Sequence, residues 1–231
     1  NVDVAKLKAE FMQHYYDANG VPFRSKLIAN FTRSANLGAI APGIYNFIMN
    51  NGVISKSVKK FSGFAVERSM PTLHKTTLEK WYKKPRQQKM GNGTGTKKTG
   101  KEYLFCDELT NYNDTLIGIK AIQLLEKLGY EVTIPKHIES GRAWLSKGLI
   151  RKGKEIANKN IALLHPFISA TTPLIGIEPS AILTFRDEYI DLANDDLFDK
   201  AKQRAENVFM IDAFIGNEIE KRNISSEQFT K

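Results

Sequence analysis

The stretch YLFCDELTNYND, residues 103–114, shows how the second part of the chain folds. Its first four residues are apolar or aromatic, which is typical of a buried strand. Asp and Asn residues that can cap a helix follow at once, and the helix predicted after Asp114 has a regular apolar face that ends at Gly129. A strand that runs directly into a helix is the unit from which parallel sheets are built.

The same order of elements returns further along the chain. Residues 132–134 predict a short strand, and a long helix follows over roughly 143–165. Residues 173–178 predict a third strand, with Pro179 in the first position of the next helix. The last predicted element is a long amphipathic helix from about Asp196 to Arg222. This alternation predicts the α/β class: a three-layer, parallel-sheet βαβαβ domain over residues 101–231, with a long C-terminal helix.

Residues 1–84 predict a helical part. Apolar residues recur at helical spacing from Val4 to Tyr15, and Gly20 ends that helix. Further helices are predicted to end near Gly38, to begin at Pro42 and to cover 72–84, with a short turn over 53–60. Because these helices are short, we expect them to pack on something outside themselves. The polar, Gly- and Lys-rich residues 85–100 predict a flexible linker.

The composition of the chain limits the kinds of function that it can have. The chain of 231 residues has one cysteine, Cys106, which excludes an internal disulfide framework and favours a reducing, cytoplasmic compartment. No apolar run approaches the ~20 residues of a membrane span. Residues 1–100 hold 17 Lys and Arg against 5 Asp and Glu, whereas residues 101–231 hold 17 against 20. A basic half can bind nucleic acid, an anionic surface or an acidic partner, and a solvated surface is the more usual explanation. We expect no nucleic acid, because the basic residues are dispersed.

Ligands bind beyond the carboxyl ends of the strands in open parallel sheets. Three segments follow the predicted strands there: 107–114, 136–142 and 178–186. Their polar side chains include Asp107, Glu108, Asn111, Asn113, Asp114, His137, Glu139, Glu178, Ser180 and Arg186. No short metal motif is present, so solvated or ion-paired carboxylates are the simpler interpretation. An enzyme domain that binds a small molecule or a metal through these carboxylates stays open as an alternative, as does a nucleic-acid or anionic-surface module in the basic half.

The three segments resemble the cysteine-rich (CCG) domain. LFCDELTNYND (104–114) resembles its first loop, ESGR (139–142) followed by LSKGL (145–149) resembles its Cys-Cys-Gly segment, and GIEPSA (176–181) followed by LTFRDEY (183–189) resembles its third loop. That domain occurs in subunits of heterodisulfide reductase and anaerobic glycerol-3-phosphate dehydrogenase, and in the iron–sulfur components of glycolate and D-lactate oxidases. The resemblance covers about residues 101–195.

The cysteines of that family are missing here. By the resemblance, the first falls at Glu108, the pair at Glu139 and Ser140, and the last at Ala181, while Cys106 lies two residues away from the first. Iron–sulfur clusters need several thiolates. We therefore expect a degenerate copy with no cluster, and assign no catalytic, cofactor-binding or metal-binding residue. Any residual site would act through hydrogen bonds of its loops and helix caps. The residues expected in it are Asn111, Asn113, Glu139, Ser140, Glu178, Ser180 and Arg186.

The two ends of the chain extend the resemblance. Residues 1–10 resemble the helix that follows a ferredoxin-like motif, and residues 229–231 resemble the approach to a second cysteine-rich domain. The resemblance implies an internal fragment of a fused, FAD-linked iron–sulfur oxidoreductase of the hydroxy-acid or glycerol-3-phosphate dehydrogenase type. Its implied role is structural and docking. The implied partners are the flavin, ferredoxin-like and second cysteine-rich domains of one parent chain, with FAD and iron–sulfur clusters elsewhere in that parent. Peripheral membrane association of the parent is compatible with the basic half.

Overall fold

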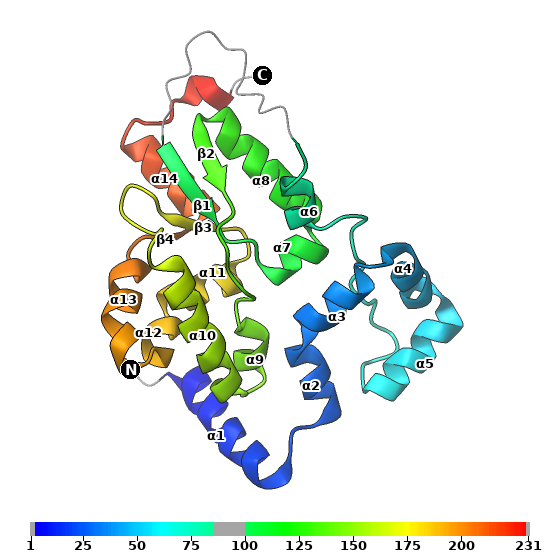
Figure 1. Ribbon diagram of the computed structural model, residues 1–231. Helices are drawn as coiled ribbons and strands as arrows, with labels where there is room; N and C mark the ends of the chain where they lie inside the picture. The colour runs from blue at the N-terminus through cyan, green and yellow to red at the C-terminus, as the bar shows by residue number, and fades with distance from the viewer. Residues whose placement is uncertain (1–2, 86–99, 230–231) are drawn as a thin grey trace.

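The computed structural model describes residues 3–85 and 100–229, and its centre is a parallel sheet (Figure 1). The four strands are β1 (Gly100–Leu104), β2 (Tyr130–Thr133), β3 (Leu174–Gly176) and β4 (Val208–Met210), in the order β2-β1-β3-β4. Every neighbouring pair is parallel. The predicted α/β class with a parallel sheet is therefore confirmed.

Helices cover both faces of the sheet, and alternate residues of the first strand segment show why. Tyr103 and Phe105 face one core, where they pack with helices α10 (Ile150–Leu164), α11 (Pro179–Arg186), α12 (Glu188–Leu192) and α13 (Asp195–Ala205). Leu104 and Cys106 face the other core, with α8 (Thr115–Lys127), α14 (Ile211–Glu220) and α6 (Leu78–Tyr82). The side-chain period of two in a strand thus builds three layers.

The prediction of one long C-terminal helix from Asp196 to Arg222 is wrong. Helix α13 ends at Ala205, β4 follows, and α14 begins at Ile211. Val208 is buried and pairs with Leu174 of β3, so these residues form the edge of the sheet. A strand of three residues is too short to interrupt the helical periodicity on either side of it.

The prediction of a single helix over residues 143–165 is also wrong, because two helices form there. Helix α9 (Arg142–Ser146) and α10 are separated by Gly148, whose φ is +70°. Only glycine adopts that conformation without strain, so the chain turns there and the helix restarts at Ile150.

The helical part forms an arm along the carboxyl edge of the sheet (Figure 1). It contains α1 (Val4–Asn19), α2 (Phe23–Ala29), α3 (Phe31–Gly38), α4 (Pro42–Asn50) and α5 (Gly52–Ser62). The predicted helix starts and stops at Gly20, Gly38 and Pro42 are confirmed. The turn predicted over 53–60 is a full helix, because Asn51 caps it through two backbone N–H groups.

The helix predicted over 72–84 forms only over Leu78–Tyr82, where Thr77 caps it. It packs against α7 (Glu108–Tyr112) and α8 rather than against the arm. The linker predicted over 85–100 lies outside the described residues except at its two ends, so the boundaries 1–84, 85–100 and 101–231 stay a prediction. No helix within the described ranges is long and apolar enough to span a membrane.

Candidate functional site

The three sequence-predicted loops meet around one cavity of about 920 Å³. Glu108, Ser140 and Ala181, one from each loop, all line it. Its other wall comes from helices α2–α5 of the arm and the segment that follows them. Because the carboxyl ends of parallel strands share an edge, residues 32 to 73 positions apart in the sequence converge here.

Glu108 and Ser140 are hydrogen-bonded to each other. The Ser140 backbone N–H lies 3.1 Å from Glu108 Oε2, and the Ser140 hydroxyl donates to Oε1 at 2.6 Å. Both residues are buried, and Glu108 follows Asp107, the cap of α7. Burial raises the pKa of the Glu108 carboxyl, while the two Ser140 donors oppose that rise. The first and second loops are therefore joined by a carboxylate–hydroxyl pair.

A buried network fixes the second loop. The Tyr189 hydroxyl donates to the Ser140 carbonyl at 2.9 Å, and Asn160 Nδ2 donates to the Glu139 carbonyl at 2.8 Å. Gly141 has φ +74°, and a Cβ there would lie 3.1 Å from Ile156. Burial raises the pKa of Tyr189, so its hydroxyl keeps its proton and remains a donor. Sequence reasoning missed Tyr189 and Asn160, whose partners are distant in the chain.

The third loop is closed by its own capping contacts. Glu178 accepts a hydrogen bond from the Ala181 N–H at 2.6 Å and from the Ser180 hydroxyl at 3.0 Å. Ala181 is buried and presents only a methyl group to the cavity.

Glu139 does not line the cavity. Its Oε2 accepts from the Thr32 hydroxyl at 2.7 Å, and its Oε1 accepts from Trp144 Nε1 at 3.3 Å. This carboxylate therefore ties α3 of the arm to α9 of the α/β layer.

Three further residues of the predicted residual site also lie outside the cavity. Asn111 Oδ1 accepts from the Glu79 N–H at 3.1 Å, and Asn113 Nδ2 donates to the Thr72 carbonyl at 2.7 Å. These bonds hold α6 and the segment before it against α7 and its C-cap. Arg186 is exposed and pairs with Asp187. The structure thus brings Glu108, Ser140, Glu178, Ser180 and Ala181 together, and leaves Asn111, Asn113, Glu139 and Arg186 apart from them.

His137 and Cys106 form a structural contact near the site. His137 Nε2 accepts from the Cys106 backbone N–H at 3.3 Å, and Nδ1 donates to the Ile138 carbonyl. Burial lowers the pKa of His137 and raises that of the Cys106 thiol, so both side chains are held neutral. Neither residue lines the cavity.

The four positions where the resemblance implies cysteines do not fit an iron–sulfur cluster. They offer two carboxylates, a hydroxyl and a methyl group, with no thiolate, and Glu139 points elsewhere. Clusters of this kind are held by thiolate sulfur. Within residues 3–85 and 100–229, no group of three or more His, Cys, Asp or Glu side chains could hold a metal ion.

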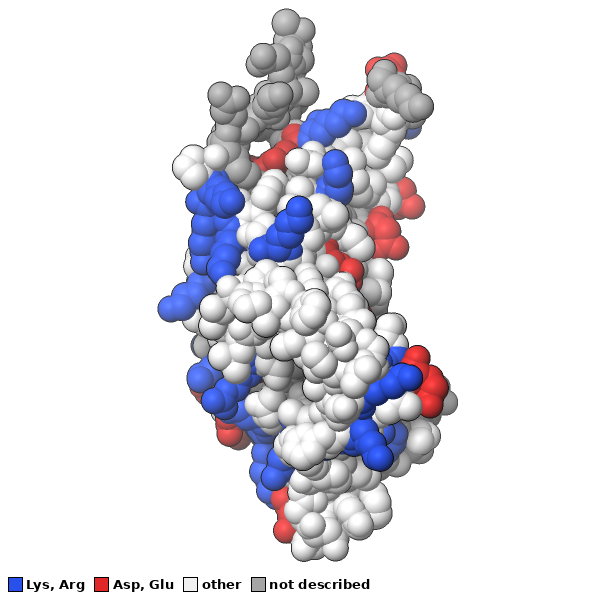
Figure 2. All heavy atoms as spheres, turned by 90° about the vertical axis from the view of Figure 1, so that its right-hand side faces the viewer, with Lys and Arg blue, Asp and Glu red and all other residues white. Residues whose placement is uncertain are grey.

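Cationic side chains that the sequence did not single out complete the cavity. Lys59, Arg24 and Arg68 come from the arm, and Arg142 and Lys147 come from the α/β layer. Figure 2 shows the side of the molecule that carries α4 and α5, where Lys and Arg side chains lie around a broad area of uncharged residues.

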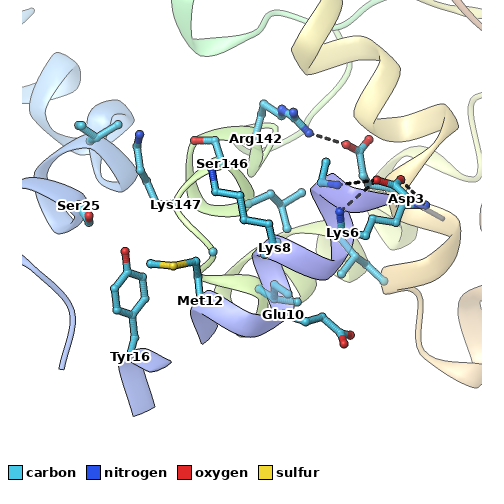
Figure 3. A pocket seen from close by; sticks show the side chains of 18 of the residues that line it. Asp3, Lys6, Lys8, Glu10, Met12, Tyr16, Ser25, Arg142, Ser146 and Lys147 are labelled. Carbon is cyan, nitrogen blue, oxygen red and sulfur yellow. Dashed lines mark hydrogen bonds and ion pairs between the residues drawn. The ribbon is translucent and has the colours of Figure 1, made fainter. Parts of the chain in front are cut away.

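A second cavity of about 650 Å³ adjoins the first beneath α1 and shares Arg24, Arg142 and Lys147 with it. Figure 3 shows that Arg142 and Lys6 there turn toward acidic partners, which are Glu188 and Asp191. Lys147 has no carboxylate partner among the described residues.

Three curated proteins that are similar to this chain carry one name. The chain is 25% identical over 190 residues to D-2-hydroxyglutarate dehydrogenase of Escherichia coli (strain K12), a match that covers 81% of this chain and 19% of that protein. The proteins of the same name from Pantoea ananatis (strain AJ13355) and Haemophilus influenzae (strain ATCC 51907 / DSM 11121 / KW20 / Rd) are 26% identical over 200 residues and 23% identical over 190 residues. Each match again covers 81% of this chain, with 19% and 18% of those proteins.

The chain is thus related, at modest identity, to a class of oxidoreductases, and it spans about a fifth of the length of the curated relatives it matches. No family model matches the chain, and no solved structure matches it.

Proposed function

We propose that this chain is a structural and docking domain of a larger flavin-linked, iron–sulfur dehydrogenase that oxidises D-2-hydroxyglutarate. The observation that carries the proposal is the similarity of 81% of the chain to about a fifth of D-2-hydroxyglutarate dehydrogenases. In that parent, FAD takes two electrons from the hydroxy acid to give the 2-oxo acid, and iron–sulfur clusters pass the electrons to an acceptor. The degenerate cysteine-rich domain holds no cluster of its own. We expect this parent to act in the cytoplasm, with or without peripheral contact to a membrane.

The docking role is supported by the outer surface of the arm. Large apolar side chains stay exposed there: Ile40 is 78% exposed, Phe47 66% and Phe61 82%. Isolated exposed apolar residues are ordinary, but several on neighbouring helices are typical of an interface. The proposed partners are the flavin, ferredoxin-like and second cysteine-rich domains of the parent chain.

The contacts of the acidic residues support a role that is not catalytic. Asp107, Glu108 and Glu178 each accept hydrogen bonds from neighbouring backbone N–H groups and hydroxyls, as capping and loop-closing residues do. A general acid or base needs access to a substrate proton. These carboxylates are instead used within the fold.

The proposal is tested in the full-length dehydrogenase that carries this segment. We expect the purified enzyme to reduce its flavin with D-2-hydroxyglutarate. The double substitution Phe47→Glu and Phe61→Glu should preserve flavin reduction by substrate but slow electron transfer to the clusters, because charged side chains would separate the docked modules. The matched control is Phe198→Glu, where the side chain is 42% exposed and belongs to α13 rather than to the arm.

Two outcomes would contradict the proposal. Absence of any reaction with D-2-hydroxyglutarate would contradict the proposal that this hydroxy acid is the substrate. Equal electron-transfer rates in the arm variant and the Phe198→Glu control would remove the docking role.

A further inference from the structure

The cavity between the arm and the three loops has acidic side chains whose oxygens are already occupied. Asp107 accepts from the Leu109 and Thr110 N–H groups and from the Thr110 hydroxyl. Glu108 accepts twice from Ser140, and Glu178 caps α11. Burial raises the pKa of Asp107 and of Glu108, while these hydrogen bonds oppose that rise. The lining carries five Lys and Arg side chains against these three acids, so positive charge is in excess there.

The cationic side chains in the same wall have few partners. Lys59 is 7% exposed, and its ammonium group donates to the Val66 carbonyl at 3.2 Å, with no carboxylate within reach among the described residues. Arg68 and Lys147 likewise form no ion pair within the described part of the chain. A buried ammonium is costly to desolvate unless an opposite charge lies beside it. The cavity therefore presents positive charge that the fold itself leaves uncompensated.

The remaining wall is apolar and large enough for a small molecule. Phe31, Met49 and Phe64 line it, and the Arg24 guanidinium lies 5.5 Å from the centroid of the Phe64 ring. Small-molecule sites are typically mostly apolar clefts of roughly 300–1,000 Å³ with a few charged groups that fix orientation. The 920 Å³ cavity lies within that range.

We infer that this cavity is a binding site for a small organic anion, whose acidic group pairs with Lys59, Arg68 and Lys147 and whose apolar body packs on Phe31 and Phe64. The inference does not depend on the proposed dehydrogenase. It rests only on residues of this chain, and it assigns to the cavity a ligand rather than a metal cluster.

The test uses a pair of fluorescent probes on the full 231-residue chain. The first is 8-anilinonaphthalene-1-sulfonate, and the second is N-phenyl-1-naphthylamine, which has the same aromatic body without the sulfonate. We expect saturable binding of the sulfonate that the neutral analogue does not match, because only the sulfonate pairs with the cations.

Variants locate the site. Lys59→Met keeps most of the length of the side chain and removes its charge, and Arg68→Met removes a charge at an exposed position. Each should weaken sulfonate binding about tenfold, as the loss of one charge-assisted hydrogen bond predicts, and leave the neutral probe unchanged. Lys60→Met is the matched control, since Lys60 neighbours Lys59 on α5 but is exposed and outside the cavity lining. Unchanged melting temperatures establish that the variants are folded.

Competition identifies the acidic group. If glutarate displaces the sulfonate probe, the natural ligand carries a carboxylate. If inorganic phosphate displaces it, the natural ligand is phosphorylated. The inference is overturned if neither competes, if both probes bind equally, or if Lys60→Met weakens the sulfonate as much as Arg68→Met does.

Discussion

Ser140 donates two hydrogen bonds to one carboxylate, with its hydroxyl 2.6 Å and its backbone nitrogen 3.1 Å from the oxygens of Glu108. The two residues stand where the resemblance implies cysteines of two different loops. A cluster would join those loops through metal–thiolate bonds, whereas here a buried hydrogen-bonded pair joins them directly. This pair therefore holds the two loop tips close together.

The Glu108–Ser140 pair should contribute measurably to stability. Ser140→Ala removes the hydroxyl donor and leaves a buried carboxylate oxygen without its partner, which costs roughly 1–3 kcal/mol. Urea unfolding measures the loss. Ser146→Ala is the control, because the Ser146 hydroxyl is exposed and donates only to the Ala143 carbonyl of its own helix. Equal unfolding free energies in the two variants would contradict the prediction.

Anaerobic reconstitution with iron and sulfide should leave the chain without stoichiometric iron. Its one thiol, Cys106, is buried, and burial raises its pKa well above the usual range, so no thiolate is presented at the cavity. Iron and sulfide analysis after desalting should give the same result for the natural chain and for Cys106→Ser. Stoichiometric iron in the natural chain would refute the loss of the cluster site.

Stability should fall as the pH rises toward 8, because of Glu102. Its side chain is 3% exposed, and its Oε2 has no hydrogen-bond partner among the described residues. Burial, together with the nearby Glu218 charge, raises the pKa of Glu102 from 4.5 to about 8. Between these two values the folded chain holds a proton that the unfolded chain has lost, so rising pH favours unfolding.

Glu102→Gln tests that relationship, since it keeps the shape and removes the titration. We expect a flatter dependence of the unfolding free energy on pH between about 4.5 and 8, and a gain of roughly 1–3 kcal/mol at the upper end. Glu131→Gln, an exposed carboxylate on β2, should leave the pH dependence unchanged. A natural chain whose stability does not vary over this range would disprove the prediction.

Gly148 fixes the place where α1 packs on the α/β layer. A Cβ at this position would lie 2.4 Å from the Met12 Cβ and 3.2 Å from the Ala9 carbonyl oxygen, and the φ of +70° disfavours any other residue. Gly148→Ala should therefore displace α1 and accelerate amide hydrogen exchange in residues 4–19, at a cost of roughly 1–3 kcal/mol. Gly43→Ala is the control, because nothing lies within 4 Å of its Cβ. Unchanged exchange in α1 would show that the contact does not hold the helix.

Much of this architecture could be predicted from the sequence, because it depends on the chemistry of residues that are close together in the chain. The apolar run at 103–106 followed by Asp107 specifies a strand that ends in a capped helix, and Pro42 and Pro179 each begin a helix as their fixed φ predicts. These features depend on residues within one turn of each other, so a sequence displays them. The order of strands and helices then leaves a parallel sheet as the simplest solution.

Tertiary structure decided what local patterns do not contain. The strand at Val208–Met210 exists because it pairs with β3, and Lys59 lines the same cavity as the loop tips because the arm folds across the carboxyl edge of the sheet. The Glu108–Ser140 pair joins residues 32 positions apart. Such contacts form between segments that only the packed fold brings together. Residue types and their spacing therefore predict that the loops lie at one edge of the sheet. Which side chains meet there is determined by the three-dimensional packing.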